Sequence, residues 1–399
     1  MRKKLTHTHF WKSVQSTTFY TIATITFFLS FAQLMPKINT DWLDAEKLIV
    51  EHVQFSDLFF RFHAKECCPA YNGRQVFVVD ISEYQEREQV AELFDSLYAA
   101  EPYMVALDII FGDYAIQDTA TNRRLTESVK RLPNLVLAQE IRAVDADRQT
   151  HLRSFFADEV QAEEALVNLP TAIVRKWHSA KRIGNDTFPT FAAAIARKMG
   201  VKVPMTEDEW LIDYSIRDTI VMRPKMQSFD FRFLRNQVVI VGDVQDLRDS
   251  HVVPFAYRTT MRMSGVLVHK QIVQTIIARQ WIHQAGKTWE WFFLSIVIWL
   301  FIFLDERLSY ITNKDKQEQY NVLVSFAKFL TLSAAILITY LLFYRAQVYC
   351  NVWSVILAPA MFVVFKGIAM FIAGCIQLVI MSGRYVAKAI FKTKKSKQG

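Results

Sequence analysis

The sequence is poor in cysteine, which limits the kinds of protein that it can encode. Four cysteines among 399 residues do not make the framework of a disulfide-stabilised domain. Cys67 and Cys68 are adjacent, and neighbouring Cα atoms lie about 3.8 Å apart, below the usual disulfide range. We interpret them as two thiols near the start of a strand, with a vicinal redox switch as the alternative. The chain also lacks sequence repeats, low-complexity tracts and a long Pro/Ser linker.

Acidic residues are missing from both ends of the chain, although the whole chain has 39 of them. Residues 1–16 and 382–399 carry only basic charges, and both segments flank apolar runs. A nucleic-acid-binding protein would instead carry its basic residues on a folded domain, interleaved with aromatics. The pattern therefore indicates the positive-inside arrangement of a membrane protein, with both ends in the cytoplasm and no nucleic-acid partner.

The apolar residues concentrate in four runs, at Phe19–Met35, Trp289–Leu304, Leu323–Tyr344 and Val352–Met381. A membrane-spanning helix needs about 20 apolar residues. The first run is near the short limit and also resembles a signal peptide, but an uncleaved anchor is the preferred interpretation. The basic charges of the short loops agree with four spans. We therefore predict a multi-pass protein of the bacterial inner membrane, N-in and C-in, with its main domain exported.

Lys366 lies in the middle of the last apolar run. A lysine within a span is costly and is a functional candidate by default. A span that starts near Val352 would let its long side chain reach the cytoplasmic headgroups. Snorkelling and contact with a partner helix both stay open, and either role would be structural or signal-transmitting.

The middle of the chain, residues 37–287, reads as a soluble domain between spans. Continuous β-branched runs predict buried parallel strands, and runs of helical periodicity lie between them. The expected strands are Gln75–Ile81, Tyr103–Phe111, Asn134–Gln139 and Gln237–Gly242, with short edge strands at Trp210–Tyr214 and Thr219–Arg223. The expected helices are Arg87–Ala100, Asn122–Lys130, a segment after Phe188, and Gly265–Ile277. This alternation predicts an α/β domain with a mixed, partly parallel sheet and flanking helices.

The prediction thus divides the chain into four parts. Residues 1–36 form the basic start and the first span, and residues 37–287 form the exported domain. Residues 288–381 form three further spans, and residues 382–399 form a basic cytoplasmic tail.

A series of short segments follows one order along the exported part. They are Asp57-Leu-Phe-Phe-Arg-Phe, "VFVVDIS", "ALDIIF", "NLVLAQE", "TFPTFAAAIAR", "WLIDY", "QVVIVGDVQDLRDSHVVPF" and "GVLVHKQIVQTII". This succession resembles the CHASE2 family, the extracytoplasmic sensory domains of bacterial membrane receptors. The resemblance covers about residues 50–285 and extends to one span before the domain and three after it. It implies a sensory role outside the membrane.

The chain departs from the family pattern in several places. "SEYQEREQV" replaces a Gly-Arg-Trp-Pro-like turn, Asp243 follows Gly242 where a small residue is common, and Lys270 stands in place of an alanine. Relatives usually continue after the last span into a kinase or a cyclase. Here about eighteen residues follow Met381, and there is no phosphate-binding glycine loop or kinase motif set. We expect a sensor without a cytoplasmic output domain of its own.

Asp80 and Asp108 end neighbouring strands of the expected sheet. In open α/β sheets, ligands bind outside the carboxyl ends of the strands. The two carboxylates are therefore candidate ligand-binding residues. The alternative is that each caps a helix or pairs with an arginine inside the fold.

The segment from Asp249 to Gln271 holds an Asp-x-His pair and a second histidine, and Asp249, His251 and His269 are candidate ligand-binding residues. Asp-x-His is too loose to specify a zinc site, and no serine or cysteine nucleophile stands beside a base. A loop-fixing role, metal binding and catalysis stay open, with the loop-fixing role favoured. Pro254 and Gly265 are expected to shape the path toward the membrane as structural or signal-transmitting residues.

These expectations favour a membrane-anchored sensor or binding module that is not an enzyme, binds no metal or cofactor, and signals through its spans to a protein partner or as a homo-oligomer. A non-catalytic subunit of a larger inner-membrane complex is the alternative. An exported metal-dependent enzyme is a third hypothesis.

Overall fold

The computed structural model describes most of residues 55–284 and three long helices. The described residues are 2–34, 55–65, 68–112, 119–145, 148–170, 173–218, 220–225, 229–254, 262–279, 281–309, 314–350 and 367. The chain divides into two compact units. We call them the helical unit (Met1–Leu48, Ala285–Leu342 and Cys350–Gly399) and the α/β unit (Ile49–Gln284 and Phe343–Tyr349).

A seven-stranded sheet forms the centre of the α/β unit. Its order is β10-β1-β11-β2-β3-β4, and β5 also pairs with β3. The strands are β1 (Val76–Asp80), β2 (Met104–Asp108), β3 (Val136–Asp145), β4 (Arg148–Leu152), β5 (Glu163–Leu166), β10 (Val221–Met222) and β11 (Val238–Gly242). All of these pairs are parallel except β3–β4. Helices cover both faces, which is why these strands read as unbroken apolar runs. The predicted mixed, partly parallel α/β fold is confirmed.

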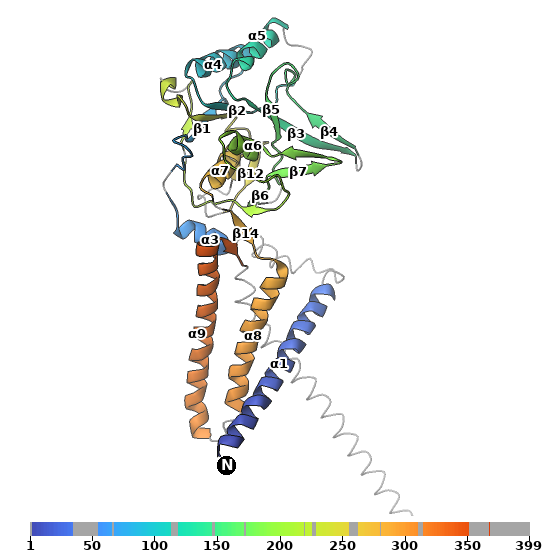
Figure 1. Cartoon of the computed structure of the whole chain (residues 1–399), viewed down its shortest axis with the longest axis vertical. Coiled ribbons are helices and arrows are strands. Elements are labelled where there is room, and N and C mark those ends of the chain that lie inside the picture. The colour runs from blue at the N-terminus through green and yellow to red at the C-terminus, as the bar shows by residue number, and fades with distance from the viewer. Residues whose placement is uncertain are drawn as a thin grey trace, which may run out of the picture. The chain divides into compact units, whose positions relative to one another are not determined.

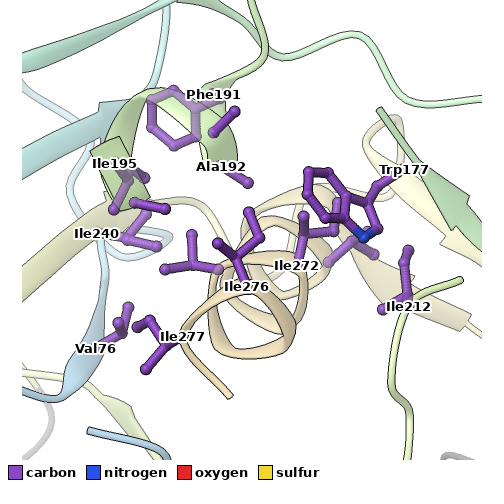
Figure 2. Packing of buried hydrophobic residues seen from close by; sticks show 14 of the residues in the cluster. Val76, Trp177, Phe191, Ala192, Ile195, Ile212, Ile240, Ile272, Ile276 and Ile277 are labelled. Atoms are coloured by element: carbon purple, nitrogen blue, oxygen red, sulfur yellow. The ribbon is translucent and has the colours of Figure 1, made fainter. Parts of the chain in front are cut away.

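One layer of helices lies on each face of the central sheet (Figure 1). Helices α4 (Arg87–Ala99) and α5 (Thr119–Lys130) cover one face of the sheet. They share a core with the strand residues that point to this face, which include Val79, Leu107 and Val241. Helices α6 (Phe191–Lys198) and α7 (Gly265–Ile277) share the other core with Val78, Ala106 and Ile240. In Figure 2, Ile272 of α7 lies beside Trp177, and Ile277 lies beside Val76.

Smaller sheets border this second core. The largest has the order β15-β14-β9-β6, from β6 (Lys176–Trp177), β9 (Trp210–Leu211), β14 (Ile282–Gln284) and β15 (Val348–Tyr349). The others pair β7 (Ala180–Ile183) with β8 (Asp186–Pro189), and β12 (Ser250–Val252) with β13 (Arg262–Ser264). The helix α3 (Phe55–Phe62) and the short 3₁₀ helix η3 (Phe231–Leu234) complete the unit. β15 follows a long helix of the C-terminal part, so the α/β unit is closed by a strand from far along the chain.

The helical unit contains α1 (Arg2–Leu34), α8 (Lys287–Ser309) and most of α9 (Lys314–Ala346). Within the described residues, two stretches are long and apolar enough to cross a membrane, Thr288–Glu306 and Tyr320–Ala346. The prediction of four spans is therefore not confirmed. The first predicted run, Phe19–Met35, overlaps the C-terminal half of α1, which is rich in threonine and is not among the two. Lys366 and the rest of Val352–Met381, apart from residue 367, lie outside the described residues.

Candidate functional site

The carboxyl edge of the sheet brings Asp80 and Asp108 to either side of Gly242. In the parallel register, Gly242 of β11 is the partner of Asp80 on β1 and also of Asp108 on β2. The prediction that Asp80 and Asp108 end neighbouring strands is wrong, because β11 lies between β1 and β2. A side chain at position 242 would be too close to its neighbours, because a Cβ there would lie 2.8 Å from Val266 Cγ2 and 3.4 Å from Asp108 Cβ. The glycine lets the start of α7 approach this edge.

Asp249 fixes the start of α7. Its backbone oxygen and its Oδ2 both accept from Gly265 N, at 2.9 and 3.1 Å, and its Oδ1 lies 3.0 Å from His251 Nε2. A Cβ on Gly265 would lie 2.3 Å from Asp249 Oδ2. The loop thus closes onto the helix because residue 265 has no side chain. The geometry matches the loop-fixing interpretation of Asp249 and His251, and their ligand-binding role stays a prediction.

Asp80 is saturated by protein groups. Its Oδ1 accepts from Ser82 N at 3.0 Å and from Val244 N at 3.2 Å, and its Oδ2 accepts from Arg223 Nε at 3.1 Å. Its side chain is only 1% exposed, whereas that of Arg223 is 42% exposed. This arrangement is the expected structural alternative for Asp80, in which the carboxylate ties the turns after β1 and β11 together.

Asp108 differs from Asp80 although the two flank the same glycine. Its Oδ2 is buried and finds no hydrogen-bond partner among the described residues. Burial, followed by repulsion from Asp249, raises the pKa of Asp108 well above its ordinary value. Asp108 therefore favours the protonated form, in which the carboxyl can donate a hydrogen bond.

His269 lies one turn into α7 and is 3% exposed. Its Nε2 lies 3.2 Å from the Val167 carbonyl, which can only accept, so Nε2 carries the proton and Nδ1 carries a lone pair. Nδ1 is buried and has no partner in the part of the chain that the structure describes. Burial lowers the pKa of His269 to about 4, so the ring is neutral at neutral pH. A cavity of about 20 Å³, roughly one water molecule, adjoins it.

Further polar atoms at this edge are unpaired within the described residues. Ser264, the N-cap of α7, is 7% exposed, and its Oγ makes no hydrogen bond; the same holds for Ser82 Oγ after β1. Unpaired polar atoms are rare in protein interiors, so each of these atoms calls for an explanation. We call Ser82, Asp108, Ser264 and His269 the open polar set.

The metal hypothesis finds no support here. Among the residues that the structure describes, no three histidine, cysteine, aspartate or glutamate side chains are grouped so that they could hold a metal ion. Pro254 is buried, two residues after the end of β12. Cys67 lies outside the described residues, and Cys68 is half-buried.

Comparison with protein families identifies the chain. The model of the CHASE2 domain matches residues 24–304. The chain belongs to the CHASE2 domain family. Comparisons with curated proteins and with solved structures find no match. CHASE2 domains are extracytoplasmic sensory domains, which fits a sensor module.

Sequence reasoning missed the role of Lys270, although it noted this lysine as a departure from the CHASE2 pattern. Lys270 Nζ lies 2.8 Å from Asp218 Oδ2, and both side chains are 2% exposed. Burial disfavours the charge on Asp218, but the Lys270 ammonium outweighs it and lowers the pKa of Asp218. Gln274 Nε2 also donates to Asp218, at 2.7 Å. A lysine in place of an alanine marks position 270 as unusual in the sequence, but nothing in the sequence indicates Asp218 as its partner.

A second buried pair in this CHASE2 domain joins Asp57 and Arg175, at 3.0 Å with exposures of 1% and 9%. In the sequence, Asp57 stands out only as the first residue of the aromatic segment Asp57-Leu-Phe-Phe-Arg-Phe. Such pairs fix geometry more than they add net stability, because desolvation offsets much of the attraction. This one holds α3 against the segment before β6.

Proposed function

We propose that this chain is an extracytoplasmic sensor that binds a small polar ligand at the open polar set and passes the change to a partner through its membrane helices. The open polar set is the observation that supports the ligand site. Its members come from the ends of β1 and β2 and from the start of α7, where α/β sheets commonly bind ligands. A ligand there would pair with groups that the protein leaves unpaired.

The charges at this edge indicate what such a ligand must supply. Asp80 and the Asp249 carboxylate already accept hydrogen bonds from protein donors. Asp108 can donate when protonated or accept when ionised, His269 Nδ1 accepts, and the two hydroxyl groups do both. A polar molecule with both donors and acceptors fits better than a simple anion, because an anion would lie close to the carboxyl groups of both Asp108 and Asp249.

α7 offers the path from this edge toward the membrane helices. It begins at Gly265 and ends at Ile277, and the Arg279 carbonyl just beyond it accepts from Gln347 Nε2 at 3.3 Å. The backbone of Gln347 accepts from His283 N at 2.9 Å, and β14 pairs with β15. Gln347 directly follows α9, which is continuous from Lys314 to Ala346. A displacement of α7 therefore has a hydrogen-bonded route to α9.

We further propose that four spans anchor the chain in the inner membrane, N-in and C-in, with the CHASE2 domain outside. The basic ends support this topology. Within the helical unit, α1 buries a stripe of hydroxyl residues, Ser13, Thr17, Thr21 and Thr24. α1 packs on α8, and Trp299 Nε1 donates to Thr18 Oγ1 at 3.3 Å. Small and hydroxyl residues are typical of helix contacts within membranes.

The partner, the absence of catalysis and the absence of a cofactor remain proposals. A non-catalytic structural subunit of a larger membrane complex would also need a partner, but it would need no ligand. Native mass measurement after gentle detergent extraction tests the need for a partner. A lone monomer would contradict the structural-subunit alternative.

The ligand site is tested by screening ions and small metabolites for a rise in the unfolding temperature of the full chain in detergent. We expect one or more polar compounds to stabilise the wild type and to lose this effect in Asp108→Asn. Asp243→Asn, at an acid on the loop beyond β11, is the matched control and should keep the effect. A screen without any stabilising compound, or a stabilisation unchanged in Asp108→Asn, would contradict the proposed site.

A further inference from the structure

The helix α3 buries Phe60 in the core, as a helix that faces water would, but it departs from that pattern at its two ends. Asp57 is fully buried against Arg175, and Ser56 is 1% exposed. At the C-terminal end of α3, Phe62 is 79% exposed, and its neighbour Arg61 is also exposed. A surface helix in water would place the carboxylate outside and the phenyl ring inside. The outer face of α3 therefore suits surroundings that accept both an aromatic ring and basic groups.

The place of α3 in the α/β unit indicates what those surroundings are. The Phe343 ring lies 5.1 Å from the Phe59 ring and 5.4 Å from the Phe60 ring, and the Tyr344 ring lies 5.8 Å from His63. Phe343 and Tyr344 occupy the last turn of the candidate span Tyr320–Ala346. α3 thus lies against the end of a span. In a bilayer this end is at the level of the headgroups.

Phe62 must lie at nearly the same level. It is three residues from Phe59 and one from His63 along the chain, and each helical residue advances about 1.5 Å. Tyr344 itself is 58% exposed, as expected of the aromatic residues that gather at membrane interfaces. Arg61 and Lys65, both exposed, add basic groups at this level.

We propose that α3 rests on the bilayer surface, with Phe62 inserted at the boundary of headgroups and acyl chains and Arg61 and Lys65 beside anionic headgroups. Interfacial helices combine an apolar side chain with basic residues in this way. The buried Asp57–Arg175 pair fixes which face of α3 meets the lipid. Lys65 is held by backbone bonds, because its N donates to Ser215 O at 2.7 Å and its O accepts from Arg217 N at 2.9 Å. The proposal rests on α9 being a span, as proposed above.

Photo-crosslinking on the full chain tests this contact. Benzoylphenylalanine replaces Phe62, and the protein is reconstituted into vesicles of phosphatidylethanolamine and phosphatidylglycerol and irradiated. We expect the protein to gain the mass of one phospholipid. Tyr98 is the matched negative control, an aromatic residue 48% exposed on α4, across the sheet from α6 and α7. Benzoylphenylalanine at position 98 should give no lipid adduct.

A third position separates the failure of this proposal from the failure of the membrane arrangement. Phe329 lies within the candidate span of α9 and is 63% exposed. Lipid adducts at 329 but not at 62 would overturn the α3 contact alone. Absence of adducts at both positions would overturn the contact and the span together. A crosslink from position 62 to a second protein chain, or equal lipid adducts at 62 and 98, would also overturn the proposal.

Discussion

At the scale of single residues, Asp80 and Asp108 lie at the same edge of the sheet but differ in their hydrogen-bond partners. Asp80 has three donors, whereas Asp108 Oδ2 has none among the described residues. Asp108→Asn should raise the free energy of unfolding near neutral pH, because it removes a buried acid without removing a bond to Oδ2. Asp80→Asn should instead cost on the order of 1–3 kcal/mol, because it weakens bonds to a charged acceptor. Urea unfolding of the two variants measures this difference, and a destabilised Asp108→Asn would contradict the account.

The raised pKa of Asp108 also has a pH signature. The folded protein binds a proton there that the unfolded chain has released, so stability falls as the pH rises from the ordinary aspartate range toward the raised pKa. Asp108→Asn should remove this part of the decline. Unfolding curves at several pH values, compared between wild type and variant, check it.

His269 gives the opposite dependence. Its folded pKa is about 4 and its ordinary value is 6.5, so the unfolded chain takes up the proton first as the pH falls. The contribution of His269 to the free energy of unfolding is therefore fully present above pH 6.5. It is lost as the pH falls toward 4, and the total loss is about 3 kcal/mol. His269→Gln should show a shallower loss between these pH values. An equal loss in the variant would mean that other groups drive the acid unfolding.

At the scale of elements, the start of α7 depends on the fit between Gly265 and the Asp249 carboxylate. Gly265→Ala should cost about 1–3 kcal/mol, because the new Cβ collides with that carboxylate. The same substitution in an Asp249→Ala background should cost clearly less, because the carboxylate is gone. Gly286→Ala is the control, since nothing lies within 4 Å of its Cβ. Additive effects of the two substitutions at 249 and 265 would contradict the fit.

The buried charge on α7 makes a second prediction at this scale. Lys270→Met should cost about 3–5 kcal/mol, because it leaves Asp218 buried without its ammonium. Lys270→Met combined with Asp218→Leu should recover much of that loss. Denaturant unfolding of the single and double variants measures it. A double variant no more stable than the single one would show that the pair itself holds α7 in place.

The sequence allowed the central strands and helices to be predicted well, because buried parallel strands and amphipathic helices leave clear periodicities. β4 was not predicted, because its pairing with the extension of β3 leaves no apolar run. The insertion of β11 between β1 and β2 was not predictable either, since residues 104 and 238 pair across a long separation. For the same reason the sequence grouped Asp108 with Asp80, and His269 with Asp249, without bringing the two groups together. Ser82, Ser264 and Asp218 emerge only from tertiary contacts.

At the scale of the whole molecule, the proposed ligand site lies at one end of α7, and a link to the candidate span α9 lies at the other end. The joint consists of the Arg279–Gln347 bond and the β14–β15 pair. Its residues lie far apart in sequence, so only a folded chain that includes α9 can form it. A truncated exported domain without residues 343–349 should therefore lose β15 and be less stable than the α/β unit of the full chain.

The most direct test of this link is hydrogen–deuterium exchange on the full chain, comparing the wild type with Asp249→Ala, which removes the carboxylate contacts with Gly265 at the start of α7 and with His251. We predict faster exchange not only at residues 265–268 but also in the peptides that contain His283 and Val348. Arg235→Ala, which breaks an exposed ion pair with Glu101 elsewhere in the unit, should leave those peptides unchanged. Faster exchange confined to the start of α7, with β14 and β15 unaffected, would contradict the claim that the site is coupled to α9.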